Sequence, residues 1–171
     1  SSTMVNKGLE VIEAKWLFGV TVDQIQVVVQ PQSIIHSMVE YEDGAVIAQL
    51  GTPDMKLPIQ YALYYPERRY LPGDRLDFGQ LSQITFEKPD METFYGLKLA
   101  IDAGKKGGSL PTVFNAANEK AVALFLDRKI RYLQIPEIIR ECMENHKNIA
   151  DPSVEEILKT EQETYEFIKN R

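Results

Sequence analysis

Four polar residues near the amino terminus have the types and spacing needed to bind a phosphorylated ligand. They lie on a loop that runs into a predicted helix and are Ser1, Asn6, Lys7 and Glu10. A helix amino terminus offers free N–H groups and the positive end of the helix dipole, and both attract phosphate. Hydroxyl, amide and ammonium groups add further donors. Glu10 follows Lys7 by one turn, so it can act there as an acid, a base or a hard-cation ligand.

The same residues also have a purely structural interpretation. Asn6-Lys7-Gly8 is a common turn sequence, and Lys7 can form a solvated ion pair with Glu10 on the helix surface. In the functional interpretation, Gly8 instead removes a side chain where a ligand approaches the backbone. Spacing by itself leaves both interpretations open.

Three other side chains, those of His36, His146 and Cys142, belong to reactive types. His36 lies in an apolar strand beside serines, where it can move protons, bind a metal or simply hydrogen-bond within the core. His146 lies near the end of a predicted helix, where a cation complements the dipole. Cys142 lies in the same predicted helix and is predicted to be buried and inert.

The first half of the chain mixes helix and strand patterns. Apolar residues at helical spacing predict an amphipathic helix from residue 6 to about 18, which Gly19 ends. The β-branched run 27–29 predicts a short strand. Asp43-Gly44 between the apolar runs 34–41 and 45–50 predicts a hairpin.

The second half is predicted to be mostly helical. Pro58 opens a short helix through Tyr65, and the proline-rich stretch that follows reads as an extended linker. Four further helices are predicted near residues 94–106, 112–127, 136–146 and 153–168, and Ser153 with Glu156 forms a capping box for the last. The expected fold class is α+β, with a helix-and-sheet domain, a linker and a carboxy-terminal four-helix bundle.

Composition excludes several classes of function. The 171 residues carry 25 acidic and 19 basic side chains, a net charge of −6, which disfavours nucleic-acid binding. No apolar run approaches the roughly 20 residues of a membrane span. The single cysteine cannot form an internal disulfide, which favours a reducing, cytoplasmic location.

The opening residues also carry a family resemblance. Ser-Ser-Thr-Met-Val-Asn-Lys-Gly-Leu-Glu-Val-Ile-Glu-Ala, residues 1–14, closely resembles a signature of the 1-deoxy-D-xylulose 5-phosphate reductoisomerase family. Similar blocks follow in order at residues 31–39, 43–44, 48–51, 53–55, 58–59, 76–78, 97–100 and 115–119. Several independent blocks in sequence are more specific than any one motif.

The resemblance implies a reaction and its cofactors. Enzymes of this family rearrange and reduce 1-deoxy-D-xylulose 5-phosphate to 2-C-methyl-D-erythritol 4-phosphate in non-mevalonate isoprenoid biosynthesis, with NADPH and Mg²⁺, Mn²⁺ or Co²⁺. Carried over by position, Ser1 and Asn6 would bind the substrate phosphate and Lys7 would contact substrate near the reacting centre. Glu10 would bind the metal, and together with Lys7 it would form the catalytic pair.

The resemblance also implies that part of the site lies elsewhere. The family places its NADPH-binding domain, two further metal carboxylates and a mobile loop before the position of Ser1. Gln30 stands where family members often carry histidine, so position 30 is assigned no catalytic part. We therefore expect the carboxy-terminal portion of the enzyme, inactive by itself.

The family architecture gives expected domain boundaries and a partner. Residues 1–65 would belong to the catalytic and dimerisation domain, residues 66–90 would be the linker, and residues 91–171 the helical domain. A homodimer would form through the sheet region 25–50. Two alternatives stay open: a non-catalytic dimerisation or interaction module derived from that enzyme, and a related reductase for another phosphorylated substrate.

Overall fold

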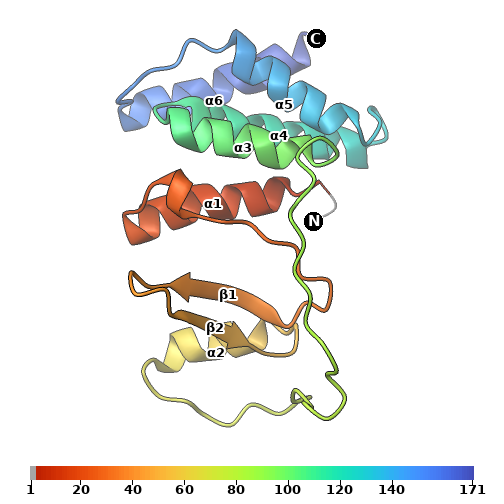
Figure 1. Ribbon diagram of the computed structural model, residues 1–171. Coiled ribbons are helices and arrows are strands. Elements are labelled where there is room, and N and C mark those ends of the chain that lie inside the picture. Colours follow the sequence, from red (N-terminus) through yellow and green to blue (C-terminus); the bar gives the residue numbers. More distant parts are fainter. Residues whose placement is uncertain (1–2) are drawn as a thin grey trace. The chain divides into compact units, whose positions relative to one another are not determined.

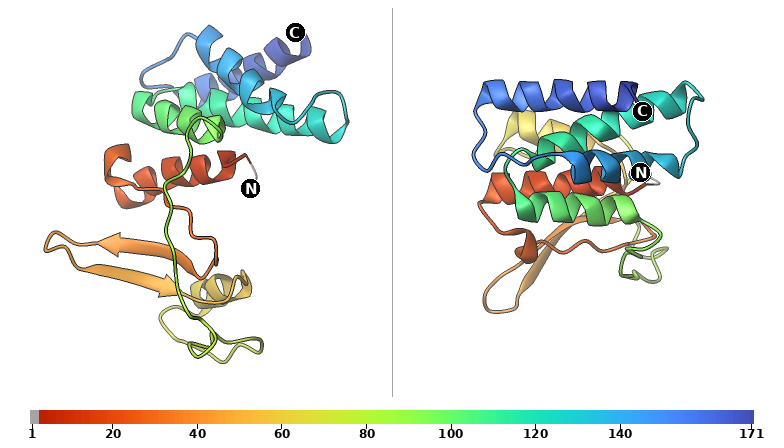
Figure 2. Two further views of the ribbon diagram at one scale, coloured as in Figure 1. Left: turned by 45° about the vertical axis from the view of Figure 1, so that its right-hand side comes forward. Right: turned by 90° about the horizontal axis from the view of Figure 1, so that it is seen from above.

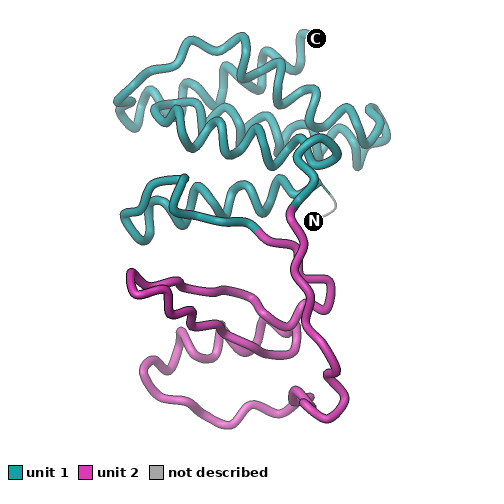
Figure 3. Tube along the Cα trace, in the orientation of Figure 1, with its two compact units in different colours: residues 1–27, 89–171 teal, residues 28–88 magenta. Residues whose placement is uncertain are grey.

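The computed structural model describes residues 3–171, which form helices and one small sheet (Figure 1). The chain divides into two compact units. A helical unit contains the residues up to Val27 together with Pro89–Arg171, and a hairpin unit contains Val28–Lys88 (Figure 3). The predicted α+β class is confirmed. None of the helices in the described part of the chain is both long and apolar enough to span a membrane.

The helical unit brings the first helix together with the carboxy-terminal ones. Its elements are α1 (Val5–Phe18), the short 3-10 helix η1 (Val22–Gln24), α3 (Tyr95–Lys106), α4 (Leu110–Leu126), α5 (Gln134–Asn145) and α6 (Val154–Lys169). Helices α3 and α4 lie between α1 and the α5–α6 pair (Figures 1 and 2). Helix α1, from the start of the chain, therefore packs on α3 of the carboxy-terminal helices.

Local signals set the ends of these helices. Gly19 ends α1 with a left-handed φ of 65°, and its N–H donates to the carbonyl oxygen of Lys15. The predicted capping box of α6 is confirmed, because Ser153 and Glu156 exchange backbone and side-chain hydrogen bonds. Helix α5 begins at Gln134, two residues before the predicted start at Pro136, which places the proline in its first turn.

The core of the helical unit is formed by apolar side chains of every α-helix in it. Phe114, Ile138 and Ile139 are fully buried, and Val5 of α1 belongs to the same cluster. Burying a large apolar side chain contributes about 1.5–3 kcal/mol, so this cluster supplies the main stabilising term of the unit.

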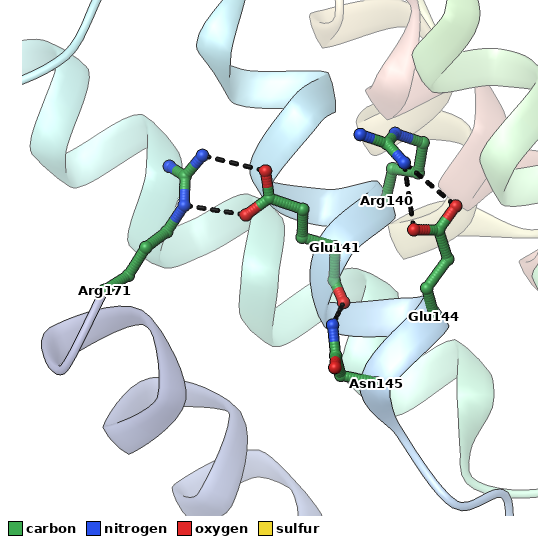
Figure 4. A network of polar contacts seen from close by, with 5 residues as sticks. All are labelled: Arg140, Glu141, Glu144, Asn145 and Arg171. Carbon is green, nitrogen blue, oxygen red and sulfur yellow. Dashed lines mark hydrogen bonds and ion pairs between the residues drawn. The ribbon is translucent and has the colours of Figure 1, made fainter.

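Polar contacts on α5 fasten the end of the chain (Figure 4). The Arg171 guanidinium makes a two-pronged contact with the carboxylate of Glu141, with Nη2–Oε1 and Nε–Oε2 distances of 2.9 and 2.7 Å. Arg140 and Glu144 pair one turn apart along the same helix. Because both side chains of the Arg171 pair are about two-thirds covered, with 35% and 32% exposed, this contact ties the carboxy terminus to α5.

The hairpin unit contains β1 (Ile35–Glu40), β2 (Val46–Leu50) and α2 (Lys56–Tyr64). The predicted hairpin is confirmed as an antiparallel pair in which Val39 lies opposite Ile47. Of the predicted turn residues only Gly44 has a positive φ, 83°, and its N–H donates to the carbonyl oxygen of Tyr41. The Tyr41 N–H also donates to the Ala45 carbonyl oxygen, so residues 42–44 form the loop and the glycine is its last residue.

The predicted strand at 27–29 is wrong. Only Val29 pairs, through a single antiparallel bridge to Glu87. A β-branched run forms a strand when a neighbouring segment pairs with it along its length. Here the neighbouring segment pairs at one residue only, Glu87.

The segment that was expected to be a linker has no helix or extended strand, but it is fastened to the hairpin unit. The Gln32 side chain donates to Thr85 Oγ1 at 2.9 Å and accepts from the Thr85 N–H at 3.2 Å. Gln60 donates to the carbonyl oxygen of Tyr70. The compact units thus separate at residues 27/28 and 88/89, whereas the division at 65/66 and 90/91 stays a prediction about domain roles.

Candidate active site on helix α1

The candidate site is built on the first two turns of α1. Met4 precedes the helix with a left-handed φ of 53°, and the carbonyl oxygen of Met4 accepts the hydrogen bond of the Gly8 N–H. The Val5 N–H donates to Thr3 Oγ1 at 3.3 Å. The first turn contains no acidic residue, so the positive end of the helix dipole has no local counter-charge there.

Three of the four predicted site residues meet on one exposed face of this helix. Asn6 Nδ2 donates to Glu10 Oε1 at 2.9 Å, and Lys7 Nζ contacts Glu10 Oε2 at 2.5 Å. The Lys7 and Glu10 side chains are 46% and 45% exposed. An exposed pair of this kind contributes only about 0.3–0.5 kcal/mol to stability, so its groups can exchange partners for a ligand at little cost. Ser1, the fourth residue, lies outside the described residues.

The opposite face of α1 is buried against α3. Val5, Gly8 and Val11 are its buried residues. The expectation that Gly8 clears space for a ligand is wrong, because a Cβ there would overlap the Cβ of Ala100 on α3. Gly8 is therefore a packing residue that lets two helices approach closely.

The residues present match part of the ligand set of a hard divalent cation. Mg²⁺ and Mn²⁺ prefer carboxylate and other oxygen ligands, and Glu10 offers one carboxylate. Within residues 3–171 no cluster of three or more histidine, cysteine, aspartate or glutamate side chains could hold a metal ion. Helix α1 thus offers one of the oxygen ligands that such a cation takes.

Both histidines form hydrogen bonds within the chain. His36 Nε2 lies 3.2 Å from the carbonyl oxygen of Gly51, which matches the hydrogen-bonded interpretation, but the residue is exposed rather than in the core. His146 Nε2 lies 2.7 Å from Ser109 Oγ, and burial lowers the pKa of His146 below its ordinary value of 6.5. The expected role of His146 as a helix-end cation is therefore wrong.

Ser109 anchors a clasp between two connections of the helical unit. It is fully buried, its Oγ accepts from the Ile149 N–H at 2.9 Å, and its own N–H donates to the Ile149 carbonyl oxygen. Asn148 Oδ1 accepts from the Ser109 hydroxyl at 3.2 Å. This clasp joins the α3–α4 turn to the α5–α6 connection, and none of its buried side-chain nitrogen or oxygen atoms lacks a hydrogen-bond partner.

Cys142 behaves as the sequence predicts. Its side chain is 4% exposed, and burial raises the pKa of the Cys142 thiol to about 11. A thiol of that pKa holds almost no thiolate at neutral pH, so it is inert.

Sequence reasoning missed the residues of α3 that hold the site helix. Gly96, Ala100 and Gly104 recur at every fourth position and therefore share one face of α3. That spacing of small residues is a signal of close helix packing. Its partner, α1, lies about 90 positions earlier, which the spacing alone does not reveal.

Comparison with known proteins gives one consistent family. Residues 50–167 match a model of the DXP reductoisomerase C-terminal domain. Curated relatives named 1-deoxy-D-xylulose 5-phosphate reductoisomerase are 68% identical in Agathobacter rectalis and 66% identical in Lachnospira eligens. Both matches cover the whole chain but 45% of each relative, so the chain spans less than half their length.

Solved structures agree with the sequence relatives. The Zymomonas mobilis reductoisomerase, solved with NADPH, is 46% identical with a TM-score of 0.90, over 98% of this chain and 44% of that one. A DOX-P reductoisomerase solved with NADPH, fosmidomycin and magnesium is 42% identical with a TM-score of 0.92, over 98% of this chain and 43% of that one. From these matches and from the fold, the chain belongs to the 1-deoxy-D-xylulose 5-phosphate reductoisomerase family.

Proposed function

We propose that this chain is the carboxy-terminal portion of an enzyme that converts 1-deoxy-D-xylulose 5-phosphate to 2-C-methyl-D-erythritol 4-phosphate with NADPH and a divalent metal. The observation that carries the proposal is the exposed cluster of Asn6, Lys7 and Glu10 at the amino-terminal end of α1, in a chain of this family. The cluster combines donors for phosphate with a carboxylate for a metal.

Phosphate binding is the first task of this cluster. The Asn6 amide and the Ser1 hydroxyl would donate to phosphoryl oxygens, beside the positive end of the α1 dipole. Lys7 would contact the substrate closer to its reacting carbons, where an ammonium group stabilises negative charge. Holding a phosphate far from the reacting carbons turns binding energy into correct positioning.

Glu10 would supply one carboxylate ligand to the metal. When bound, Mg²⁺, Mn²⁺ or Co²⁺ polarises substrate oxygens, and NADPH supplies the hydride of the reduction. The contacts from Asn6 and Lys7 orient the Glu10 carboxylate on the exposed face of α1. In the described residues the candidate site contains one carboxylate, that of Glu10, and the sequence has no glycine-rich nucleotide-binding turn. We therefore expect the chain alone to have no activity.

The remaining features of the proposal concern architecture and location. Residues 1–65 would contribute to catalysis and dimerisation, residues 66–90 would connect, and α3–α6 within residues 91–171 would form the carboxy-terminal helical domain. We place the enzyme in the cytoplasm, since its cysteine is a buried free thiol.

We propose a homodimer formed through the 25–50 sheet region. Val39, Val46 and Ile47 of the hairpin are 55–63% exposed. Exposed apolar side chains grouped on a strand pair are typical of an interface. A second subunit is the partner that the family architecture implies.

The test of the function uses the full-length enzyme that contains this chain. Replacement Glu10→Gln removes the ligand charge without changing shape, and we expect kcat/KM to fall about 10²-fold or more, with the loss sensitive to metal concentration. The control Glu13→Gln changes an exposed carboxylate one turn further along α1 and should leave kcat/KM unchanged. A fully active Glu10→Gln enzyme would contradict the assignment.

A second variant tests the phosphate-side role. Lys7→Ala should raise the KM for the substrate and lower kcat, because the ammonium group contacts substrate before and during the reaction. Wild-type kinetics in this variant would remove Lys7 from the site.

A further inference from the structure

Helices α1 and α3 approach so closely at their amino-terminal ends that neither has room for a methyl group. A Cβ on Gly96 would lie 2.5 Å from Val5 Cγ2 and 3.2 Å from the carbonyl oxygen of Thr3. A Cβ on Gly8 would overlap the Cβ of Ala100. Ordinary contacts begin near 3.4 Å, so an added methyl on Gly96 requires a movement of about 0.9 Å.

The fit is looser at the other end of the same helix pair. The two helices run parallel, since Val5 meets Gly96, Gly8 meets Ala100 and Ile12 meets Gly104. A Cβ on Gly104 would lie 3.3 Å from Ile12 Cγ1 and 3.2 Å from Val22 Cγ2, distances that a small side-chain adjustment relieves. Lys15 Nζ also donates to the Gly104 carbonyl oxygen at 2.9 Å.

The tight end of this contact lies under the candidate site. Asn6 and Lys7 lie between Val5 and Gly8 in the sequence, and Glu10 follows within one turn. Because all of them share one rigid helix, a displacement of this turn moves the three functional groups together. Their distance from ligands supplied by other parts of the enzyme then changes by a similar amount.

We propose that Gly96 and Ala100 of α3 are positioning residues of the reductoisomerase site, which act through α1 to set where Asn6, Lys7 and Glu10 stand. This rests on the proposed function and extends it to a helix that touches no substrate. Helix α3 in turn packs on the core of the helical unit, so it gives α1 a rigid support. A misplacement of about 1 Å in an active site can cost about 10²-fold in rate, so a displacement of this size at the α1–α3 contact is large enough to impair catalysis.

The first experiment compares Gly96→Ala with Gly104→Ala in the full-length enzyme. Both variants place the same methyl on the same face of α3, one at the tight end and one at the loose end. We expect Gly96→Ala to raise both the dissociation constant for Mn²⁺, measured by electron paramagnetic resonance, and the substrate KM by about tenfold or more. Gly104→Ala should keep both within about twofold of wild type. Equal constants in Gly96→Ala and wild type would overturn the proposal.

A volume swap separates positioning from simple loss of folding. Gly8→Ala should weaken Mn²⁺ and substrate binding, and the double variant G8A/A100G should restore both because it moves one methyl from α3 to α1. Thermal unfolding of each variant is measured alongside. If Gly8→Ala or Gly96→Ala does not fold, the swap decides. Two results would overturn the proposal. In one, the folded swap variant binds Mn²⁺ no better than a folded Gly8→Ala; in the other, it does not regain wild-type binding.

The same assays keep this inference apart from the proposed function. Wild type and Glu10→Gln are measured in parallel. Loss of Mn²⁺ binding in Glu10→Gln with unchanged binding in Gly96→Ala rejects the role of α3 alone. A wild-type enzyme without activity, or Glu10→Gln with normal Mn²⁺ binding, rejects the function on which the inference depends.

Discussion

The helical unit and the hairpin unit differ in where their apolar side chains lie. Every hydrophobic residue that is buried in the described chain belongs to the helical unit, and none belongs to residues 28–88. In the hairpin unit large apolar side chains remain open to solvent, with Ile47 63% and Leu63 77% exposed. The helical unit thus has a hydrophobic core, whereas the hairpin unit leaves large apolar side chains exposed to solvent.

This difference indicates how the two units contribute to an enzyme. A two-stranded hairpin is marginally stable at best without a hydrophobic face packed on something else. The hairpin unit is therefore suited to docking against another subunit or another part of the enzyme. The helical unit stands on its own core and holds α1, so the candidate site rests on the more rigid of the two.

The largest expected effect comes from the core of the helical unit. Phe114→Ala removes a fully buried ring, and we expect the free energy of unfolding to fall by about 3–5 kcal/mol. The matched change Ile59→Ala in the hairpin unit, at a side chain 54% exposed, should alter it by less than about 0.5 kcal/mol. Urea unfolding followed by circular dichroism gives both values. Similar losses in the two variants would contradict the comparison.

A smaller effect is expected at the buried clasp. Ser109→Ala leaves the Ile149 N–H without its acceptor and deprives His146 of its partner, which should cost about 1–3 kcal/mol. Ser37→Ala, at an exposed serine of the hairpin unit, is the control. The same urea titration should find no measurable change there. A neutral Ser109→Ala would show that water replaces the hydroxyl in the clasp.

The clasp also makes the helical unit sensitive to pH. Burial lowers the pKa of His146 below 6.5 and outweighs the opposite effect of the Glu163 charge, while the charge of Lys106 adds to the lowering. The unfolded chain therefore binds the proton first as the pH falls. The contribution of His146 is present above pH 6.5 and is lost as the pH falls from there through the lower folded pKa. We expect the thermal midpoint of wild type to fall more between pH 7.5 and about pH 5 than that of His146→Asn. Parallel curves for the two proteins would exclude the effect.

Features set by neighbours in the sequence were predicted well. Gly19 ends α1, Gly44 closes the hairpin, and Ser153 with Glu156 starts α6, because each acts on backbone groups within four residues. The meeting of Asn6, Lys7 and Glu10 follows from helical spacing in the same way. The family resemblance then supplied what spacing could not, namely the chemistry that such a cluster would serve.

Features set by distant partners were not predicted. The prediction for Gly8 is wrong because nothing near it in the sequence reveals Ala100, its actual neighbour. The helix end at His146 is visible in the sequence and favours a positive charge, whereas its burial and its hydrogen bond with Ser109 are not visible there. The run 27–29 has strand propensity but only one residue to pair with. In each case tertiary contact decided between alternatives that local pattern left open.

The smallest effect on stability should come from the exposed side of the hairpin, and this prediction separates folding from assembly. Val39 and Ile47 lie opposite each other on the two strands and are 56% and 63% exposed. Replacing Ile47 by serine removes one cross-strand apolar contact, worth about 0.2–1 kcal/mol, from a unit that has little else to lose. In this chain alone the urea midpoint should barely move.

In the full-length enzyme the same Ile47→Ser change should instead shift the sedimentation behaviour from dimer towards monomer, if the sheet region is the subunit contact. Gln49→Ser, an exposed polar residue on the same strand, is the control that should leave the dimer intact. A dimer unaffected by Ile47→Ser would move the proposed interface away from this strand. It would leave the other part of the enzyme as the cover for the hairpin, because the exposed apolar surface still requires one.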